Sequence, residues 1–290
     1  MTDKFYEEYD PVIYRELHDD LAQFSELDLA AHFNNHGQDE GRISNIIKSR
    51  YDFIPLIPLE SSILEIGPFY SPVVKGENVK YFDVLSYDEL LARAKSLNHP
   101  VDDIPFIQFV EPNGNLGIIK EQFDVVVSSH NIEHQPDFVI HLQKVEKLLN
   151  PGGLFFCMIP DKRYCFDHFM PETTIADIIS RHEEQVKTHY LKSVIEHLVL
   201  TTHNDPSRHW AGDHGVQYPP DFKYLLSEAL REYKEANGAY IDVHAHYFTP
   251  QRFSEIISRL NELELTKLAM IRNYHTRRNQ SEFFVIMQKT

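Results

Sequence analysis

The segment Phe123–Ser128 constrains the fold of this 290-residue chain more than any other, because it reads FDVVVS, a nearly continuous run of apolar and β-branched residues. A strand of this kind is buried on both faces, as in a parallel sheet covered by helices. Apolar residues then follow at helical spacing over Asp137–Leu149, before the turn Asn150–Gly153 and a second apolar strand over Leu154–Ile159. This alternation predicts a doubly wound parallel sheet.

The alternation of strands and helices extends to both sides of this segment. Short apolar strands are predicted over Ile63–Gly67 and Asn78–Val84, and a weaker one over Ile104–Val110. Near the end of the chain, Leu265–Ile271 and Glu282–Gln288 are two further strands joined by a short link. This pair predicts an antiparallel hairpin at one edge of the sheet. The fold class is therefore α/β, with a mostly parallel sheet.

Two segments stand outside this alternation. Residues 1–50 have apolar residues at helical spacing, which predicts an N-terminal helical appendage, and residues 51–290 are predicted to form the α/β domain. Within that domain, an insertion is expected at about residues 161–245. Its expected elements are a helix, a loop and a charged helix, in that order, over Ile175–Leu200, His203–Pro220 and Asp221–Asn237.

Composition excludes several classes of function. The 28 Lys and Arg residues against 44 Asp and Glu residues give a formal net charge of −16, so we expect no binding of nucleic acid through bulk charge. Two cysteines allow at most one disulfide and are typical of a reducing compartment. The N-terminus lacks the pattern of a secretory signal, and no apolar run approaches the ~20 residues of a membrane helix. We therefore expect a cytoplasmic protein without a transmembrane segment.

The order of three motifs resembles that of the class I S-adenosylmethionine-dependent methyltransferases. The motifs are ILEIG followed by Asp83, then FDVVVSSHNIEHQPDF, then LLNPGGLFFCMIPD. The resemblance covers residues 60–160 strongly and the last forty residues weakly. It implies a Rossmann-like sheet of seven strands with an antiparallel C-terminal edge strand, methyltransferase activity, and S-adenosylmethionine as the cofactor.

The resemblance also implies which residues bind the cofactor, at the ends of the first strands. Glu65 and Gly67 end the first strand, and Gly67 lets the backbone approach a ligand without a Cβ. Asp83 ends the second strand, where it can accept hydrogen bonds from the ribose hydroxyls; the alternative is a helix N-cap or turn residue. Asp83 lies only sixteen positions after Gly67, which leaves little room for the crossover helix usual in the family. The other residues assigned to the cofactor are Pro68, Phe69, Tyr70, Asn115, Leu116, Ser129 and His134.

The seventeen histidines are the unusual feature of the composition, and twelve of them lie between His130 and His246. Methyl transfer to a hydroxyl needs a general base or a metal ion, and histidine suits the first role at neutral pH. His130 follows the fourth strand, and His209 and His214 lie in the loop of the insertion, so these three are the candidate catalytic residues. The alternatives are a capping or packing histidine at 130 and chance histidines in a surface loop. The sequence has no metal-binding motif of fixed spacing, so no metal ligand is assigned. Use of a divalent metal ion stays an open alternative.

Two shorter resemblances bear on the acceptor. The stretch HFNNHGQDEGR, over His32–Arg42, is similar to a helical unit found beside bacterial surface-polysaccharide enzymes; the alternative is a helical cap on the next domain. Ile159–Thr174 resembles a stretch of glycan-biosynthesis methyltransferases, with Met170 in place of their arginine. Together they imply O-methylation of a sugar or glycan intermediate with a histidine base, a small-molecule or glycan acceptor, and association with glycan-assembly enzymes.

Two other functions stay open at this point. One is a non-catalytic protein that has the S-adenosylmethionine-binding fold and serves as the partner of a glycosyltransferase. The presence of Glu65, Gly67 and Asp83 argues against this function, because an inactive site does not need these residues. The other is a metal-dependent hydrolase that uses the histidine loop, which the strand order disfavours. The identity of the acceptor and the oligomeric state do not follow from the sequence.

Overall fold

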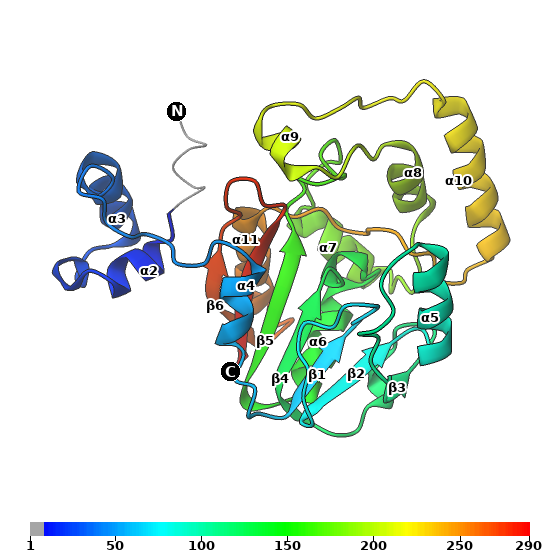
Figure 1. The fold of residues 1–290 in the computed structure, drawn as a ribbon, viewed down its shortest axis with the longest axis horizontal. Helices are drawn as coiled ribbons and strands as arrows, with labels where there is room; N and C mark the ends of the chain where they lie inside the picture. Colours follow the sequence, from blue (N-terminus) through cyan, green and yellow to red (C-terminus); the bar gives the residue numbers. More distant parts are fainter. Residues whose placement is uncertain (1–8) are drawn as a thin grey trace.

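A computed structural model describes residues 9–290; residues 1–8 of the predicted N-terminal appendage lie outside the described residues. Seven strands form one sheet in the order β3-β2-β1-β4-β5-β7-β6 (Figure 1). In chain order the strands are β1 (Ile63–Ile66), β2 (Val79–Asp83), β3 (Phe109–Val110), β4 (Phe123–Ser129), β5 (Leu149–Pro160), β6 (Leu268–Tyr274) and β7 (Glu282–Lys289).

The strand directions confirm the predicted doubly wound, mostly parallel sheet. The first five strands pair in parallel, and the strand order reverses at β1, which lies between β2 and β4. β7 runs antiparallel to both of its neighbours, β5 and β6. The C-terminal hairpin therefore forms one edge of the sheet. β6 is the edge strand, and β7 lies between β6 and β5.

Alternate residues of β4 pack into separate hydrophobic cores on the two faces of the sheet. Val126 belongs to the core formed with α6 (Phe138–Leu148), α7 (Ile175–Glu183) and α11 (Pro250–Glu262), which lie behind the sheet in Figure 1. Val125 and Val127 belong to the core on the other face, formed with α4 (Arg50–Phe53), η3 (Ile54–Leu56) and α5 (Tyr87–Ser96). The β-branched run is buried on both faces, as its composition predicts.

A loop, and not a helix, connects β1 to β2. The short spacing between Gly67 and Asp83 predicts this departure from the usual crossover, and the structure confirms it. α5 follows β2 instead and begins at a capping box formed by Ser86 and Glu89. Short 3-10 turns follow β3 and β4, at Leu116–Ile118 (η4) and Ile132–His134 (η5).

The insertion between β5 and α11 contains four helices, and one prediction about it is wrong. The helix predicted over residues 175–200 is two helices, α7 and α8 (Leu191–Val199). Gln185 has a φ of 53° just after α7 ends, in the left-handed region that stops a helix. α9 (Pro206–Trp210) lies within the predicted loop, and α10 (Phe222–Ala236) packs on α8.

The described part of the N-terminal segment is helical and has a small core of its own. Its elements are α2 (Pro11–Glu16), η1 (Asp19–Leu21), α3 (Glu26–His32) and η2 (Phe33–Gly37). Their buried side chains are Tyr9, Tyr14, Leu21, Leu29 and Phe33. α2 and α3 lie at the side of the molecule, beyond β6 (Figure 1). None of the helices in residues 9–290 is long and apolar enough to cross a membrane.

Candidate active site

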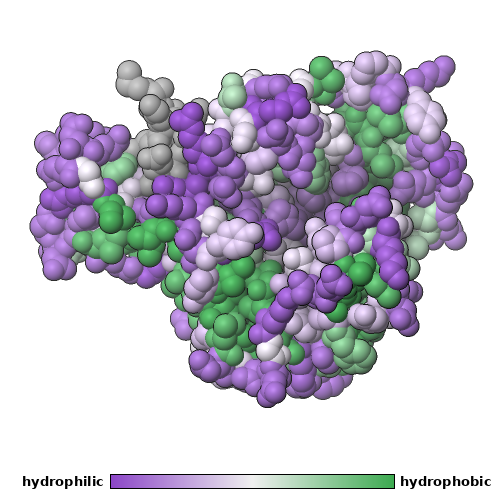
Figure 2. All heavy atoms as spheres, viewed as in Figure 1, coloured by the Kyte–Doolittle hydropathy of each residue, from purple (hydrophilic) through white to green (hydrophobic). Residues whose placement is uncertain are grey.

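A cavity of about 310 Å³ opens at the carboxyl ends of β1, β2 and β4. Gly67, Asp83 and His130, which directly follow or end these strands, line it. We call it the strand-end cavity. Figure 2 shows a hollow between the sheet and the insertion with mostly hydrophilic residues around it. Ligands of open α/β sheets bind at this position, where the strand order reverses.

Gly67 provides the close backbone approach that its position after β1 predicts. Its φ is +70°, in the left-handed region that glycine adopts without steric cost. A Cβ at this position would lie 3.0 Å from the side-chain nitrogen of Asn131. A larger residue would therefore strain the backbone and push against the segment that follows β4.

Asp83 ends β2 and lines the cavity with a buried carboxylate that is only 6% exposed. One carboxylate oxygen accepts a hydrogen bond from the backbone N–H of Leu85 at 3.0 Å. Burial raises the pKa of Asp83 because the charged form loses its hydration. A ligand that donates hydroxyl hydrogens to this carboxylate would replace part of the missing water.

Glu65 is buried within β1 and is not among the residues that line the strand-end cavity. Its carboxylate accepts hydrogen bonds from the backbone N–H groups of Val73 and Val74, at 2.7 and 3.1 Å. Burial raises its pKa to about 7, although these two hydrogen bonds oppose the shift. Glu65 therefore holds the loop that follows Gly67, and its contact with a cofactor stays a prediction.

The other residues assigned to the cofactor fall into two groups. Phe69, Leu116 and His134 line the strand-end cavity, and Asn115 lines a neighbouring cavity. Pro68, Tyr70 and Ser129 line neither cavity, and Tyr70 stacks on the ring of His99 with centroids 4.2 Å apart. The cofactor contacts of both groups stay predictions.

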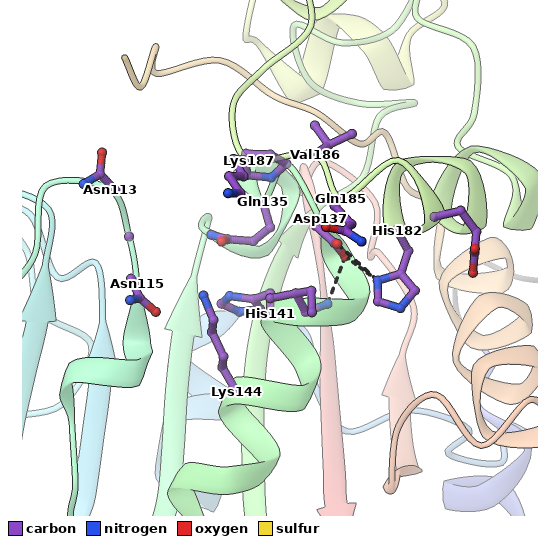
Figure 3. Close-up of a pocket in the computed structure, with 14 residues that line it drawn as sticks. Asn113, Asn115, Gln135, Asp137, His141, Lys144, His182, Gln185, Val186 and Lys187 are labelled. Atoms are coloured by element: carbon purple, nitrogen blue, oxygen red, sulfur yellow. Dashed lines mark hydrogen bonds and ion pairs between the residues drawn. The ribbon is translucent and has the colours of Figure 1, made fainter. Parts of the chain in front are cut away.

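The neighbouring cavity, which we call the outer cavity, has a volume of about 650 Å³. Asn113 and Asn115 lie on one side of it, and His141 and Lys144 of α6 lie on the other (Figure 3). It shares Asn113 and Gln135 with the strand-end cavity, so the two cavities border one another. A ligand longer than the strand-end cavity can therefore extend toward α6.

His130 is held at the wall of the strand-end cavity by two residues that the sequence analysis missed. Its Nε2 lies 2.9 Å from Oε2 of Glu282, the first residue of β7. Arg50 of α4 binds the same carboxylate with two N–H groups, at 2.9 and 2.6 Å. Glu282 is distant in the sequence from both of its partners. It lies 152 residues from His130 and 232 residues from Arg50. The only sequence signal is a carboxylate at the start of an otherwise apolar strand.

The charges of this trio shift the pKa of both titrating members. Burial opposes the ionisation of Glu282, but the hydrogen bonds from His130 and Arg50 outweigh it and lower the pKa of Glu282 to about 2. Loss of hydration also opposes a charge on His130, but the hydrogen bond that it donates to Glu282, together with the negative charges of Glu133 and Glu282, outweighs this and raises the pKa of His130 above 6.5. Glu282 is therefore ionised at neutral pH and accepts a hydrogen from the imidazole.

His209 and His214 lie together, away from the residues that line the strand-end cavity. Their Nδ1 atoms are 3.1 Å apart, and the ring of His168 stacks on His214 with centroids 3.7 Å apart. Burial lowers the pKa of His209 to about 4, so this imidazole is neutral at pH 7. An acceptor-side role for His209 and His214 stays a prediction.

In residues 9–290, two groups of side chains have the composition and spacing to ligate a metal ion. One is the cluster of His168, His209 and His214. The other is formed by Glu133, His134 and His244, of which His134 also lines the strand-end cavity.

Comparison with known proteins identifies the family of this chain. A family profile described as "Methyltransferase domain" matches residues 38–261. No curated protein sequence matches the chain.

Among solved structures, three similar ones are S-adenosylmethionine-dependent methyltransferases from Clostridium acetobutylicum and Thermotoga maritima and the CurJ carbon methyltransferase. The first is 9% identical, with 90% of this chain and 98% of that chain covered and a TM-score of 0.41. The second is 10% identical, with coverages of 83% and 88% and a TM-score of 0.40. The third is 12% identical, with 79% of this chain covered and a TM-score of 0.36; the match spans 48% of the length of that protein.

Proposed function

We propose that this chain, which belongs to the class I S-adenosylmethionine-dependent methyltransferase family, methylates a hydroxyl group of a sugar or glycan biosynthetic intermediate with His130 as the general base. The cofactor of the family is S-adenosylmethionine. One observation carries the proposal: the His130 imidazole lies at the carboxyl end of β4, lines the strand-end cavity and is hydrogen-bonded to Glu282 at 2.9 Å. A base oriented by a carboxylate suits removal of a proton from an acceptor.

The residues of the strand-end cavity fit this cofactor. Asp83 would hold the ribose hydroxyls, Gly67 would let the backbone approach the ligand, and Leu116 would pack against the adenine. When bound, S-adenosylmethionine supplies a methyl group that is already activated by its positively charged sulfur. The protein is then left with two tasks, to orient the acceptor and to take up its proton.

His130 is placed to take up that proton. Because Glu282 is ionised, Nε2 of His130 donates its hydrogen to that carboxylate, and the lone pair of Nδ1 is free to accept a proton. The imidazolium that forms is stabilised by Glu282 at 2.9 Å. Arg50 fixes the carboxylate with two hydrogen bonds, so the imidazole keeps one orientation throughout.

Three observations support a hydroxyl-rich acceptor. The two sequence stretches over residues 32–42 and 159–174 resemble segments found with glycan enzymes. A net charge of −16 disfavours a polyanion and is compatible with a neutral sugar. The side chain of His130 is 42% exposed, so an acceptor can reach it from solvent. Association with glycan-assembly enzymes belongs to the same proposal.

The proposal is tested by incubating the protein with S-adenosylmethionine labelled in its methyl group and a panel of sugars, amines and carbon acceptors. Mass spectrometry of the products identifies the labelled atom. We expect a labelled methyl ether on a sugar hydroxyl. Transfer to nitrogen or carbon acceptors alone would contradict the proposal.

The same assay tests His130. We expect His130→Gln to lower kcat by about 10²- to 10⁴-fold while the affinity for S-adenosylmethionine stays unchanged, because the imidazole acts on the acceptor. His36→Gln is the matched control, since His36 is an exposed histidine in η2 of the N-terminal segment. A kcat of His130→Gln within threefold of wild type would remove His130 from the proton transfer.

A further inference from the structure

Glu133, in the turn that follows β4, is a buried carboxylate whose oxygens have no hydrogen-bond partner among the described residues. Its exposed fraction is 0%, and both side-chain oxygens lack a donor within hydrogen-bond distance. Its backbone oxygen accepts hydrogen bonds from the N–H groups of Ala245 and His246, at 2.8 and 3.1 Å. The backbone is therefore fixed while the carboxylate is left unsatisfied. A buried carboxylate in this state is costly unless a cation compensates its charge.

Two imidazoles face this carboxylate from different segments of the chain. Nε2 of His134 and Nε2 of His244 each lie 3.8 Å from Oε1 of Glu133. These distances are too long for hydrogen bonds. The two rings meet edge to face with centroids 4.5 Å apart, and the three ligand atoms lie within 4.8 Å of one another. Two ligands that each lie about 2.1 Å from one ion are roughly 3 to 4 Å apart, so the observed spacing suits a shared ion after a small contraction.

The other nitrogen of each imidazole contacts a second carboxylate. Nδ1 of His244 lies 2.6 Å from Asp167, and Nδ1 of His134 lies 3.2 Å from Asp242. The hydrogen bond of His244 Nδ1 with Asp167 leaves the lone pair of its Nε2 directed to the side where Glu133 lies, and the same holds for His134 when its Nδ1 carries the hydrogen toward Asp242. With both Nε2 atoms unprotonated, two lone pairs and an unpaired carboxylate face one another, an arrangement that a cation between them would stabilise. Carboxylates behind metal-ligating histidines orient the rings in this manner in known metal sites.

We propose that Glu133, His134 and His244 form a binding site for a divalent transition-metal ion, at the wall of the strand-end cavity. Two imidazoles and one carboxylate are a ligand set that suits Zn²⁺, and three protein ligands leave a fourth position open, as in catalytic zinc sites. His134 lines the cavity beside His130. The site therefore borders the cavity through His134, whereas Glu133 and His244 lie behind it and are buried. An ion there would lower the pKa of an acceptor hydroxyl, a role that rests on the proposed function, whereas the binding of the ion does not.

Zinc binding to the full chain, in the absence of cofactor and acceptor, tests the site. The protein is freed of metal with a chelator, titrated with Zn²⁺ and monitored by calorimetry, and its metal content is measured after dialysis. We expect one Zn²⁺ per chain, because both ring nitrogens of His209 in the other group already have hydrogen-bond partners, His214 and the backbone oxygen of His203. We expect Glu133→Gln to weaken binding by at least about 100-fold, and Asp167→Asn by about 10- to 100-fold through the orientation of His244. Because this experiment measures zinc binding and not methyl transfer, the proposed metal site and the proposed function can be contradicted independently of one another.

His209→Gln is the matched control, because it removes a buried histidine from the second histidine cluster. We expect this variant to bind zinc as wild type does. Zinc bound equally by wild type and Glu133→Gln, or lost in His209→Gln but kept in Glu133→Gln, would overturn the proposal. No saturable zinc binding by the folded wild type would also overturn it.

Thermal unfolding separates loss of the site from loss of the fold. In the presence of chelator, we expect Glu133→Gln to unfold at the same or a higher temperature than wild type, because it removes an unpaired buried charge. Added Zn²⁺ should raise the unfolding temperature of wild type and leave that of Glu133→Gln unchanged. An equal rise in both proteins would contradict the proposed ligands. If Glu133→Gln does not fold, the same comparison with Asp167→Asn decides the question.

Discussion

At the scale of single residues, the two carboxylates of the site differ because their partners differ. Asp83 has a backbone N–H as its hydrogen-bond partner, and burial raises its pKa. Glu282 has an imidazole and a guanidinium as partners, and its pKa falls to about 2. Asp83 is therefore suited to bind uncharged donors such as ribose hydroxyls, whereas Glu282 is suited to hold a charged imidazole.

Replacement of Asp83 tests its role in holding the cofactor. We expect Asp83→Ala to weaken the binding of S-adenosylmethionine by about 5- to 150-fold, which corresponds to the ~1–3 kcal/mol lost when buried donors are left without a partner. Calorimetric titration measures the change. Asp88→Ala is the matched control, since Asp88 is an exposed carboxylate five positions away, in α5. Equal affinities for Asp83→Ala and wild type would exclude Asp83 from the cofactor site.

Removing the charge of Glu282 should change the pH dependence of catalysis. A general base acts in its neutral form, so the rate rises with pH as His130 loses its proton. Glu282 raises the pKa of His130, and we therefore expect Glu282→Gln to move the acidic limb of the kcat profile to lower pH. An acidic limb that stays in place would show that the titrating group is not His130.

The same variant should alter stability in acid. The pKa of Glu282 is lowered to about 2 in the folded protein, against an ordinary value of 4.5. Its contribution to stability is therefore present above pH 4.5 and is lost as the pH falls toward 2. Urea unfolding should show that the free energy of unfolding of wild type falls more over this interval than that of Glu282→Gln. Parallel curves for the two proteins would contradict the ion pair.

At the scale of elements, the loop after β1 replaces the helix usual at this crossover, and its shape depends on two residues. Glu65 binds the backbone N–H groups of Val73 and Val74, which fixes the far part of the loop. Gly67 turns the chain at its start with a φ of +70°. The loop can therefore form one wall of the strand-end cavity without a helix behind it.

Replacement of Gly67 tests the role of this turn. We expect Gly67→Ala to lower the free energy of unfolding by about 1–2 kcal/mol, the cost of the left-handed conformation for a residue with a Cβ, and to weaken cofactor binding as well. Gly41→Ala is the matched control, because Gly41 has a φ of +65° with open space around it. It should lower stability by a similar amount and leave cofactor affinity unchanged. Equal cofactor affinity in both variants would contradict the close approach at Gly67.

The elements differed in how well the sequence predicted them, for physical reasons. β4 and β5 were predictable because strands buried on both faces need continuous apolar residues, and Val125 to Val127 provide them. The break between α7 and α8 was not predictable. Gln185, just after α7, has a positive φ, but no glycine or proline marks this place in the sequence. The segment after the break supplies Lys187 and Thr188 to the lining of the strand-end cavity.

At the scale of the whole molecule, the site is assembled from segments that are distant in the sequence. Arg50 comes from α4, His130 from the end of β4 and Glu282 from the start of β7. The order of the strands places the last two on neighbouring parts of the sheet. The sequence indicated His130 because it directly follows a strand. It did not indicate Arg50 or Glu282, whose role depends on the antiparallel placement of β7 beside β5.

The histidines also separate at this scale. His130 and His134 line the strand-end cavity, whereas His209 and His214 pack with His168 in the insertion. Composition alone could not distinguish these groups, because a count of histidines says nothing about where each one lies in the fold. Their distribution over two clusters gives the chain two separable sets of candidate chemistry, and of these only the first lines the strand-end cavity.

A crystal structure of the protein with S-adenosylhomocysteine tests the central claim most directly. We predict that the ligand fills the strand-end cavity, with its ribose hydroxyls on Asp83 and its sulfur on the side of the cavity where His130 lies. A ligand confined to the outer cavity, or a sulfur on the side away from His130, would contradict the account.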